Sequence, residues 1–571
     1  MLRKTIIITL AFTLVLTMTL GSAFGCTTIV VGKNKTADGS VMYAHSEELD
    51  GYDTQYFDYV PSQVYDPEND WWEGVDPRGV WGGRWEQYFK FGPTTFPQVA
   101  RTYSYVASKL SEKNYNPGDY TFGVNEKQVT ISNNIAYSRN YTGSRYPWDL
   151  VEGGLIWSEY TQLVLERAST AREGVELIAK LLDNGYTLSM DPGTMYLIAD
   201  PNEGWVLEMH NEGQYVAQRV PDDGFYVISN VYSIGEIDFD DPDIYYSDDV
   251  VTHAIAKGWY TPAIAGDYSD FSFKDAYGNP SYQAGEWYNL RVREAKKMLN
   301  EAPVTVPKLM EIMRTCYEGT DYYITDANGS PFNGSGSAPN GHRVMSRLDT
   351  EMSAVVQLRP DLPPEIGTTM WVALATSKTS AYIPWYLGAT VIPEQYQKGT
   401  NGSRGNKVDS AYWAYRDLSR RVHATYANSF PIVKAAWDAV EQGAFNKQDA
   451  IEAEALKIYK KSGAEAASRF LNDYSNSIAL SAYDQAGDLL KKLNNQIPLN
   501  IELSAFVEKL NGNQNNLTID LKEVYFNGNE NDFTTTIKIN NNSAGIYEVG
   551  GYKVYVDTKG NTQIRDCYIV N

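Results

Sequence analysis

Residues 26–48 read CTTIVVGKNKTADGSVMYAHSEE, and this stretch sets the expectation for the fold. Residues 26–32 are almost all apolar or β-branched, which predicts a buried strand. The pair Asp38-Gly39 favours a hairpin turn, and residues 40–46 return as a second strand. The hairpin carries the thiol of Cys26 at the start of its first strand. The far end of its second strand carries His45, Glu47 and Glu48.

The residues before Cys26 have the layout of a secretory signal peptide. A basic start at residues 1–4 leads into an apolar run at 5–20 and a small-residue segment at 21–25. Cleavage after Gly25 would make Cys26 the first residue of a secreted or cell-surface protein. A terminal cysteine can act as a nucleophile whose base is its own α-amine, since that amine has a reference pKa of about 7.7–8.0.

Two other interpretations of this start remain open. A lipoprotein would have Cys26 acylated, but its signal usually places a Leu-like residue three positions before the cysteine and a small one next. Ala23 and Phe24 occupy those positions here. An uncleaved membrane anchor would need about 20 apolar residues, and the apolar run is shorter than that. We therefore expect no membrane span in the mature chain, with cell-surface attachment as an open alternative.

Composition excludes several classes of function. The chain has 571 residues, 43% of them hydrophobic, and a formal net charge of −22, which disfavours nucleic acid as a partner because phosphates attract basic surfaces. Three cysteines cannot form a disulfide framework, although Cys316 and Cys567 could pair outside the cell. The five histidines have no metal-ligand spacing and no nucleotide fingerprint is present, so we expect no cofactor.

Several further segments follow the first hairpin in a recognisable order. They are PQVARTYSY at 97–105, FGVNEKQVTISNN at 122–134, IADPNEGWVLEM at 198–209, VISNVYSIGEID at 227–238 and the block 352–388. Together with residues 26–48 they resemble the secreted dipeptidases that are cysteine N-terminal-nucleophile hydrolases, relatives of penicillin V acylase and bile-salt hydrolase. The resemblance runs from Cys26 to about residue 490.

The resemblance and the patterning together imply an α+β fold. The expected catalytic domain, 26–495, is a four-layer αββα sandwich with the nucleophile between two sheets. Strongly helical residues 409–493 predict an added helical layer. Residues 496–571 turn to Asn, Thr and alternating apolar residues, which predicts a small β-rich module.

The resemblance also assigns roles to two asparagines. Asn230 matches the asparagine that stabilises the oxyanion in the related acylases. Asn133 fits the dipeptidase pattern for a second donor, and Asn134 is nearly as close. Without the resemblance, each would be interpreted as a turn residue that satisfies its own backbone.

Charged residues complete the expected site. The related acylases carry Arg-Asn-x-Asp where this chain has His45-Ser46-Glu47-Glu48, so only the final carboxylate is kept. Glu48 would hold the terminal ammonium and His45 would tune the thiol. Arg343 matches an arginine of the dipeptidases and could bind a substrate carboxylate in a bidentate fork, or form an ordinary salt bridge.

The sequence thus predicts a secreted cysteine dipeptidase that hydrolyses small peptides through an acyl-enzyme. Two alternatives stay open at this point. One is an acylase that cleaves N-acyl amino acids or related amides, and the other is a non-enzymatic surface lipoprotein. Turnover of dipeptides that depends on Cys26 separates the first from both others.

Overall fold

The computed structural model describes residues 25–48, 54–73, 94–111, 120–141, 154–187, 193–326, 328–332, 343–398 and 410–497, and the backbone of seven strands between 502 and 567. The expected signal peptide, apart from Gly25, lies outside these residues. No helix of the described part is long and apolar enough to cross a bilayer.

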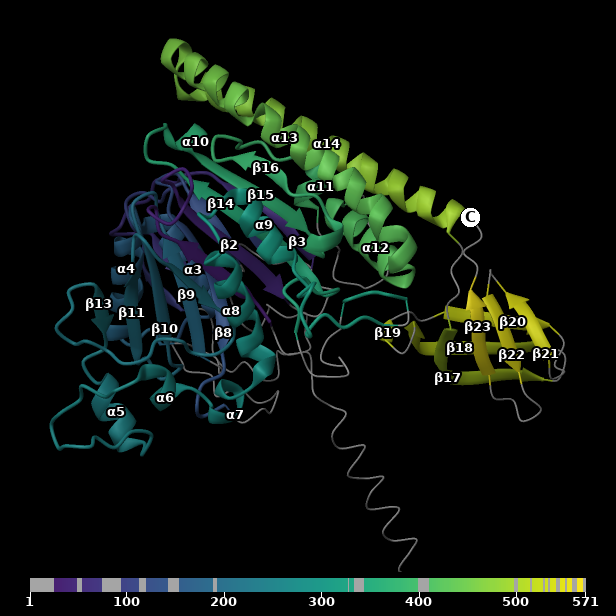
Figure 1. The fold of residues 1–571 in the computed structure, drawn as a ribbon, viewed down its shortest axis with the longest axis horizontal. Helices are drawn as coiled ribbons and strands as arrows, with labels where there is room; N and C mark the ends of the chain where they lie inside the picture. The colour runs from purple at the N-terminus through teal and green to yellow at the C-terminus, as the bar shows by residue number, and fades with distance from the viewer. Residues whose placement is uncertain are drawn as a thin grey trace, which may run out of the picture.

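Two antiparallel sheets stack face to face and form the centre of the molecule (Figure 1). The six-stranded sheet has the order β12 (Phe225–Ile228), β1 (Thr27–Val31), β2 (Val41–Glu48), β14 (Thr350–Leu358), β15 (Thr368–Leu374), β16 (Ile383–Tyr386). The eight-stranded sheet has the order β13 (Ile244–Tyr246), β11 (Tyr215–Val220), β10 (Gly204–Met209), β9 (Gly193–Ala199), β8 (Thr130–Ala136), β7 (Tyr120–Asn125), β6 (Tyr105–Ser111), β3 (Thr54–Val60).

Helices cover the outer face of each sheet. Helices α3 (Trp157–Arg167) and α4 (Ala171–Asp183) pack on the eight-stranded sheet, and α8 (Glu286–Leu299) and α9 (Val306–Arg314) on the six-stranded sheet. Thr170 caps α4 by accepting a hydrogen bond from the backbone of Glu173, as its sequence pattern predicts. The four layers αββα confirm the predicted fold class.

Both sheets are buried on two faces, and the pattern of their strands reflects this. In β1, Val30 points into the core between the sheets, whereas Ile29 and Val31 point toward α8 and α9. In β9, Leu197 faces the other sheet and Ile198 faces the helices. Successive side chains alternate between faces, so strands buried on both sides become continuous apolar runs. The same alternation places Cys26 on the face of β1 that looks toward the eight-stranded sheet.

Three helices form the added layer next to the six-stranded sheet. They are α12 (Ala411–Ala424), α13 (Tyr426–Ser462) and α14 (Ala464–Gln496), and the last two run as a long antiparallel pair along the top of Figure 1. Trp371 of β15 stacks on Phe445 of α13 with ring centroids 4.2 Å apart. The remaining short elements are β4 (Trp71–Glu73), β5 (Thr95–Pro97), α5 (Val250–Ala256), α6 (Phe273–Tyr277), α7 (Pro280–Gln283), α10 (Pro364–Gly367), η1 (Ser377–Thr379) and α11 (Glu394–Gln397).

The C-terminal segment is made of strands that pair with one another. Their order is β19 (Asn529–Asn531), β18 (Asn516–Phe526), β17 (Glu502–Asn513), β23 (Thr562–Cys567), β22 (Tyr552–Val556), β21 (Gly545–Val549), and β20 (Thr535–Asn540) pairs with β18. Cys316 carries a free, buried thiol, and the side chain of Cys567 lies outside the described residues. A pairing between them stays a prediction.

A buried ion pair fixes the added layer to the start of β14. Arg416 of α12 donates to Glu351 at 2.7 Å and to the Thr350 carbonyl at 2.6 Å, and both charged side chains are almost fully buried. Replacing Arg416 with Met should therefore lower the free energy of unfolding by about 3–5 kcal/mol, because the buried Glu351 carboxylate would lose its cationic partner. Urea unfolding followed by tryptophan fluorescence measures the change.

The exposed pair Lys434–Asp438 provides the control for this prediction. Nζ of Lys434 lies 2.6 Å from Oδ2 of Asp438, and both side chains are more than half exposed. Replacing Lys434 with Met should cost less than about 1 kcal/mol. Equal losses for the two variants would contradict the assignment of Arg416 as a structural ion-pair partner.

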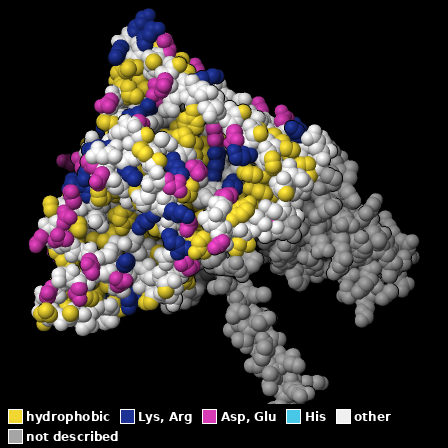
Figure 2. Space-filling model, in the orientation of Figure 1, with side chains coloured by type: hydrophobic (Ala, Val, Ile, Leu, Met, Phe, Trp, Pro, Cys, Tyr) yellow, Lys and Arg dark blue, Asp and Glu magenta, His cyan; other side chains and the backbone are white. Residues whose placement is uncertain are grey.

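Acidic and basic side chains are intermixed over the face of the molecule shown in Figure 2. The net charge of −22 is therefore not expressed as a single acidic patch on this face.

Candidate active site

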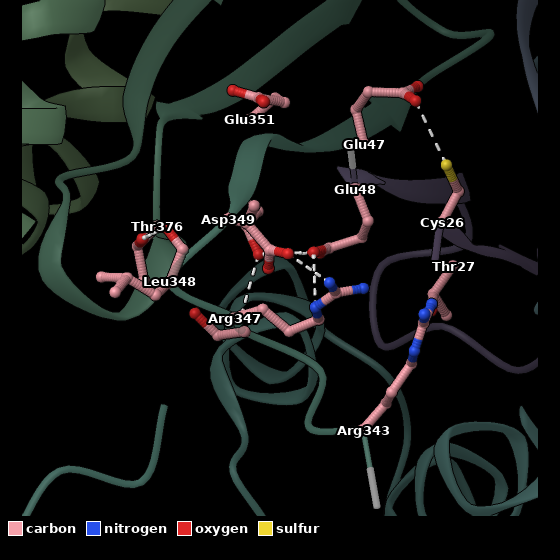
Figure 3. A network of polar contacts seen from close by, with 12 residues as sticks. Cys26, Thr27, Glu47, Glu48, Arg343, Arg347, Leu348, Asp349, Glu351 and Thr376 are labelled. Atoms are coloured by element: carbon pink, nitrogen blue, oxygen red, sulfur yellow. Dashed lines mark hydrogen bonds and ion pairs between the residues drawn. The ribbon is translucent and has the colours of Figure 1, made fainter. Parts of the chain in front are cut away.

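Cys26 lies one residue before β1, in the layer between the two sheets. It is buried, and its thiol donates a hydrogen bond to Oε1 of Glu47 at 3.2 Å, as Figure 3 shows. The backbone of Gly25 continues the pairing, since its N–H donates to the Glu48 carbonyl at 3.2 Å. Burial raises the pKa of the Cys26 thiol well above its usual value, and the neighbouring Glu47 carboxylate raises it further.

His45 and Glu47 lie beside the thiol on one face of β2. Nε2 of His45 is 3.2 Å from Oε2 of Glu47, and Nδ1 is 2.8 Å from the hydroxyl of Thr28. The ring of His45 stacks on Phe122 of the other sheet, with centroids 6.1 Å apart. The family resemblance gives a role to His45 and none to Glu47, although Glu47 contacts the sulfur directly.

Glu48 points to the opposite face of β2. It accepts hydrogen bonds from the Thr350 hydroxyl at 2.8 and 2.9 Å, and its Oε2 lies 3.7 Å from Nε of Arg347, which also pairs with Asp349 (Figure 3). Burial raises the pKa of Glu48 to about 8, and Arg347 opposes that rise. Glu48 therefore lies on the Gly25 side of Cys26.

Asn230 lies two residues after β12 and is linked to Cys26 through Arg291. Its Oδ1 accepts from Nη2 of Arg291 at 2.7 Å, and its Nδ2 donates to the carbonyl of Ile135 at 3.0 Å. Nη1 of Arg291 also donates to the Cys26 carbonyl at 2.9 Å and to the Thr27 hydroxyl at 2.8 Å. Arg291, on α8, therefore joins Cys26 to Asn230. Arg291 could not be identified from the sequence, because nothing in the pattern of one helix shows which distant loop it meets.

The structure does not bring Asn133 to this group. Its Nδ2 donates to the Thr161 hydroxyl of α3 at 3.2 Å, on the helix-covered face of β8. Asn134 points to the opposite face and enters the layer between the sheets. There it accepts from the hydroxyl of Thr28 at 2.7 Å and donates to the carbonyl of Ser229 at 3.0 Å. Of the two neighbouring asparagines, Asn134 therefore lies on the same side of β8 as Cys26.

Arg343 is buried beside Gly25. A Cβ built on Gly25 would lie 2.6 Å from Nη1 of Arg343 and closer still to Nη1 of Arg347. The guanidinium of Arg343 also lies over the ring of Tyr288, 5.6 Å from its centroid. Burial lowers the pKa of Arg343 to about 9, and the charge of Arg347 contributes. Residue 25 thus fills a narrow space between two cationic side chains, whose guanidinium ends would have to shift to admit a larger residue.

The structure thus places a buried cysteine directly before the first strand of a four-layer αββα sandwich, the arrangement expected from the family resemblance. A family model described as Peptidase family C69 matches residues 25–439, and the chain belongs to this family. The chain is therefore a peptidase.

Several known proteins are similar to this chain. The chain is 26% identical to a probable dipeptidase B of Streptococcus pyogenes serotype M1, over 70% of this chain and 79% of the relative. It is 23% identical to a probable dipeptidase of Latilactobacillus sakei, over 80% of this chain and 89% of the relative. A solved mutant of conjugated bile acid hydrolase from Clostridium perfringens shows 11% identity and a TM-score of 0.30, over 61% of this chain and 89% of that one.

Proposed function

We propose that the mature protein begins at Cys26 and is a secreted dipeptidase whose nucleophile is the Cys26 thiol. The observation that carries this proposal is the position of Cys26 between the sheets, at the start of the segment that the peptidase family model matches. Its thiol donates to Glu47, and Arg291 joins its carbonyl to Asn230. The relatives named as probable dipeptidases support a dipeptide substrate.

The reaction uses three groups of this site. The Cys26 sulfur attacks the peptide carbonyl, and the α-amine freed by removal of residues 1–25 donates a proton to the leaving amine. Asn230 stabilises the oxyanion with the second hydrogen of its amide, because the first is bound by Ile135. Arg291 acts as a positioning residue, since it fixes the amide of Asn230 against the nucleophile. Water then hydrolyses the acyl-enzyme.

Arg343 accounts for selection of a short substrate. Removing residue 25 vacates the space between Arg343 and Arg347, directly beside the new α-amine. The leaving residue of a dipeptide carries its free carboxylate close to its amine, so that carboxylate would reach the vacated space. Two guanidinium groups there would bind it through charge-assisted hydrogen bonds.

An assay of the mature chain tests this function. The chain beginning at Cys26, verified by intact mass, should hydrolyse free dipeptides, and Arg343→Gln should raise the KM for them by about 10–100-fold, the equivalent of about 1.4–2.8 kcal/mol. Dipeptide amides, which lack the carboxylate, serve as the control and should change little between the two enzymes. Turnover of N-acyl amino acids without turnover of dipeptides would instead indicate an acylase, and a mass increased by lipid would indicate a lipoprotein.

A further inference from the structure

Glu47 lies between the thiol of Cys26 and the imidazole of His45. Its Oε1 accepts from the sulfur at 3.2 Å, and its Oε2 lies 3.2 Å from Nε2 of His45. All three side chains are buried in the layer between the sheets. The carboxylate therefore has one oxygen on the nucleophile and the other on the histidine.

A chain of hydrogen bonds fixes the tautomer of His45. The Asn134 amide donates to the Ser229 carbonyl, so its oxygen is the atom that faces the hydroxyl of Thr28, 2.7 Å away. Thr28 gives its proton to that oxygen and must therefore accept from Nδ1 of His45 at 2.8 Å. Nδ1 carries a hydrogen as a result, and Nε2 is the nitrogen that can gain or lose a proton.

Oε2 of Glu47 and Nε2 of His45 cannot face each other with lone pairs alone. A proton must lie between them, either on the carboxyl or on the imidazole. With the thiol proton, this makes two protons distributed over three sites. The three sites are the sulfur, the carboxylate and Nε2, and every distribution with both protons bound has zero net charge.

We propose that Glu47 is a catalytic residue that relays the thiol proton toward His45, which acts as a positioning residue and proton store. The Sγ–H bond breaks as an O–H bond forms at Oε1, and the proton at Oε2 passes to Nε2. A thiolate and an imidazolium result, with a neutral carboxylic acid between them. No net charge enters or leaves the buried site, so the cost of desolvating an isolated thiolate is avoided.

The relay rests on the proposed function and assigns the two proton transfers of that site to different groups. The thiol ionises through Glu47 and His45, so the terminal α-amine keeps its proton for the leaving amine. Four other ionisable groups lie near the relay: Tyr43 and Glu48 on β2, Arg291 on α8 and Arg347 before β14. From the eight-stranded sheet, the relay is faced by Phe122, Ser132 and Asn134, none of which is ionisable.

The pH dependence of Cys26 alkylation by iodoacetamide tests the relay in the mature chain. Glu47→Gln and His45→Gln should each move the pH of half-maximal alkylation upward by about one unit or more, because the thiolate loses its imidazolium counter-charge. Each should also lower kcat/KM for dipeptides by at least about 10-fold. Ser46→Ala is the matched control, since Ser46 lies between them on β2 and its hydroxyl has no hydrogen-bond partner in the described part of the chain. It should leave the alkylation profile unchanged.

The direction in which the alkylation midpoint moves decides whether the relay is right. If Glu47 were only an anion that opposes thiol ionisation, Glu47→Gln would move the midpoint to lower pH, and the relay would be wrong. Unchanged midpoints in both variants would also overturn it. Two variants on different residues guard against a single failure to fold, which thermal melting would reveal. Alkylation needs no substrate, so a shifted midpoint in an enzyme that cleaves no dipeptide would refute the proposed function and leave the relay standing.

Discussion

Replacing Cys26 with Ala in the chain that begins at residue 26 should lower kcat/KM for dipeptides by at least about 10³-fold. In the proposed function the Cys26 sulfur attacks the carbonyl, and Arg291 joins this residue to Asn230. Covalent catalysis would be lost completely, leaving only the oxyanion contacts and substrate binding. Initial rates on a free dipeptide, with a mass spectrum of the trapped acyl-enzyme in the parent chain, measure the effect.

Cys316 provides a matched control for that substitution. It is also a free and fully buried cysteine, and its thiol contacts the Ser346 carbonyl at 3.5 Å. Cys316→Ala should change kcat/KM by less than about threefold, because a buried thiol outside the site only packs. Activity that survived in Cys26→Ala, or that was lost equally in Cys316→Ala, would remove Cys26 from the role of nucleophile.

Retaining Gly25 at the N-terminus should lower dipeptide hydrolysis nearly as much, by about 10²-fold or more. The amide of the Gly25–Cys26 bond cannot exchange a proton with the leaving group as an α-amine can. The glycine also occupies the space between Arg343 and Arg347, where the substrate carboxylate is expected. Both the acid that serves the leaving amine and the carboxylate site are therefore blocked by one residue.

A comparison of two otherwise identical chains measures this effect. One begins with Cys26 and the other with Gly25-Cys26, and intact mass before and after the assay establishes that the glycine is still attached. Treatment with an aminopeptidase that removes glycine should restore activity. Full activity in the chain that keeps its glycine would show that the terminal amine takes no part in the reaction.

Much of the fold follows from local patterns. Apolar strands, the Asp38-Gly39 turn and the helical spacing of residues 409–493 identify the elements, and the order of the matched segments identifies the family. Each of these signals is local, because it depends on residues within one strand, one turn or one helix. The position of Cys26 at the start of the first strand is also a local signal.

The face on which Asn133 and Asn134 lie is not a local property. Both faces of β8 are buried, so alternation along the strand shows that the two side chains point in opposite directions without showing which face meets the other sheet. The pairing of whole strands decides this, and it places Asn134 beside Thr28 while Asn133 contacts α3.

What the sequence by itself determined is the nucleophile candidate, the layered fold and the family. Only the tertiary structure decided that Glu47 accepts a hydrogen bond from the Cys26 thiol. The same holds for the contact of Arg291 with Cys26, across 265 residues of chain, and for the position of Gly25 beside Arg343. The physical reason is that hydrophobic periodicity specifies elements and their buried faces, whereas contacts between polar groups depend on register and helix docking, which the whole chain sets at once.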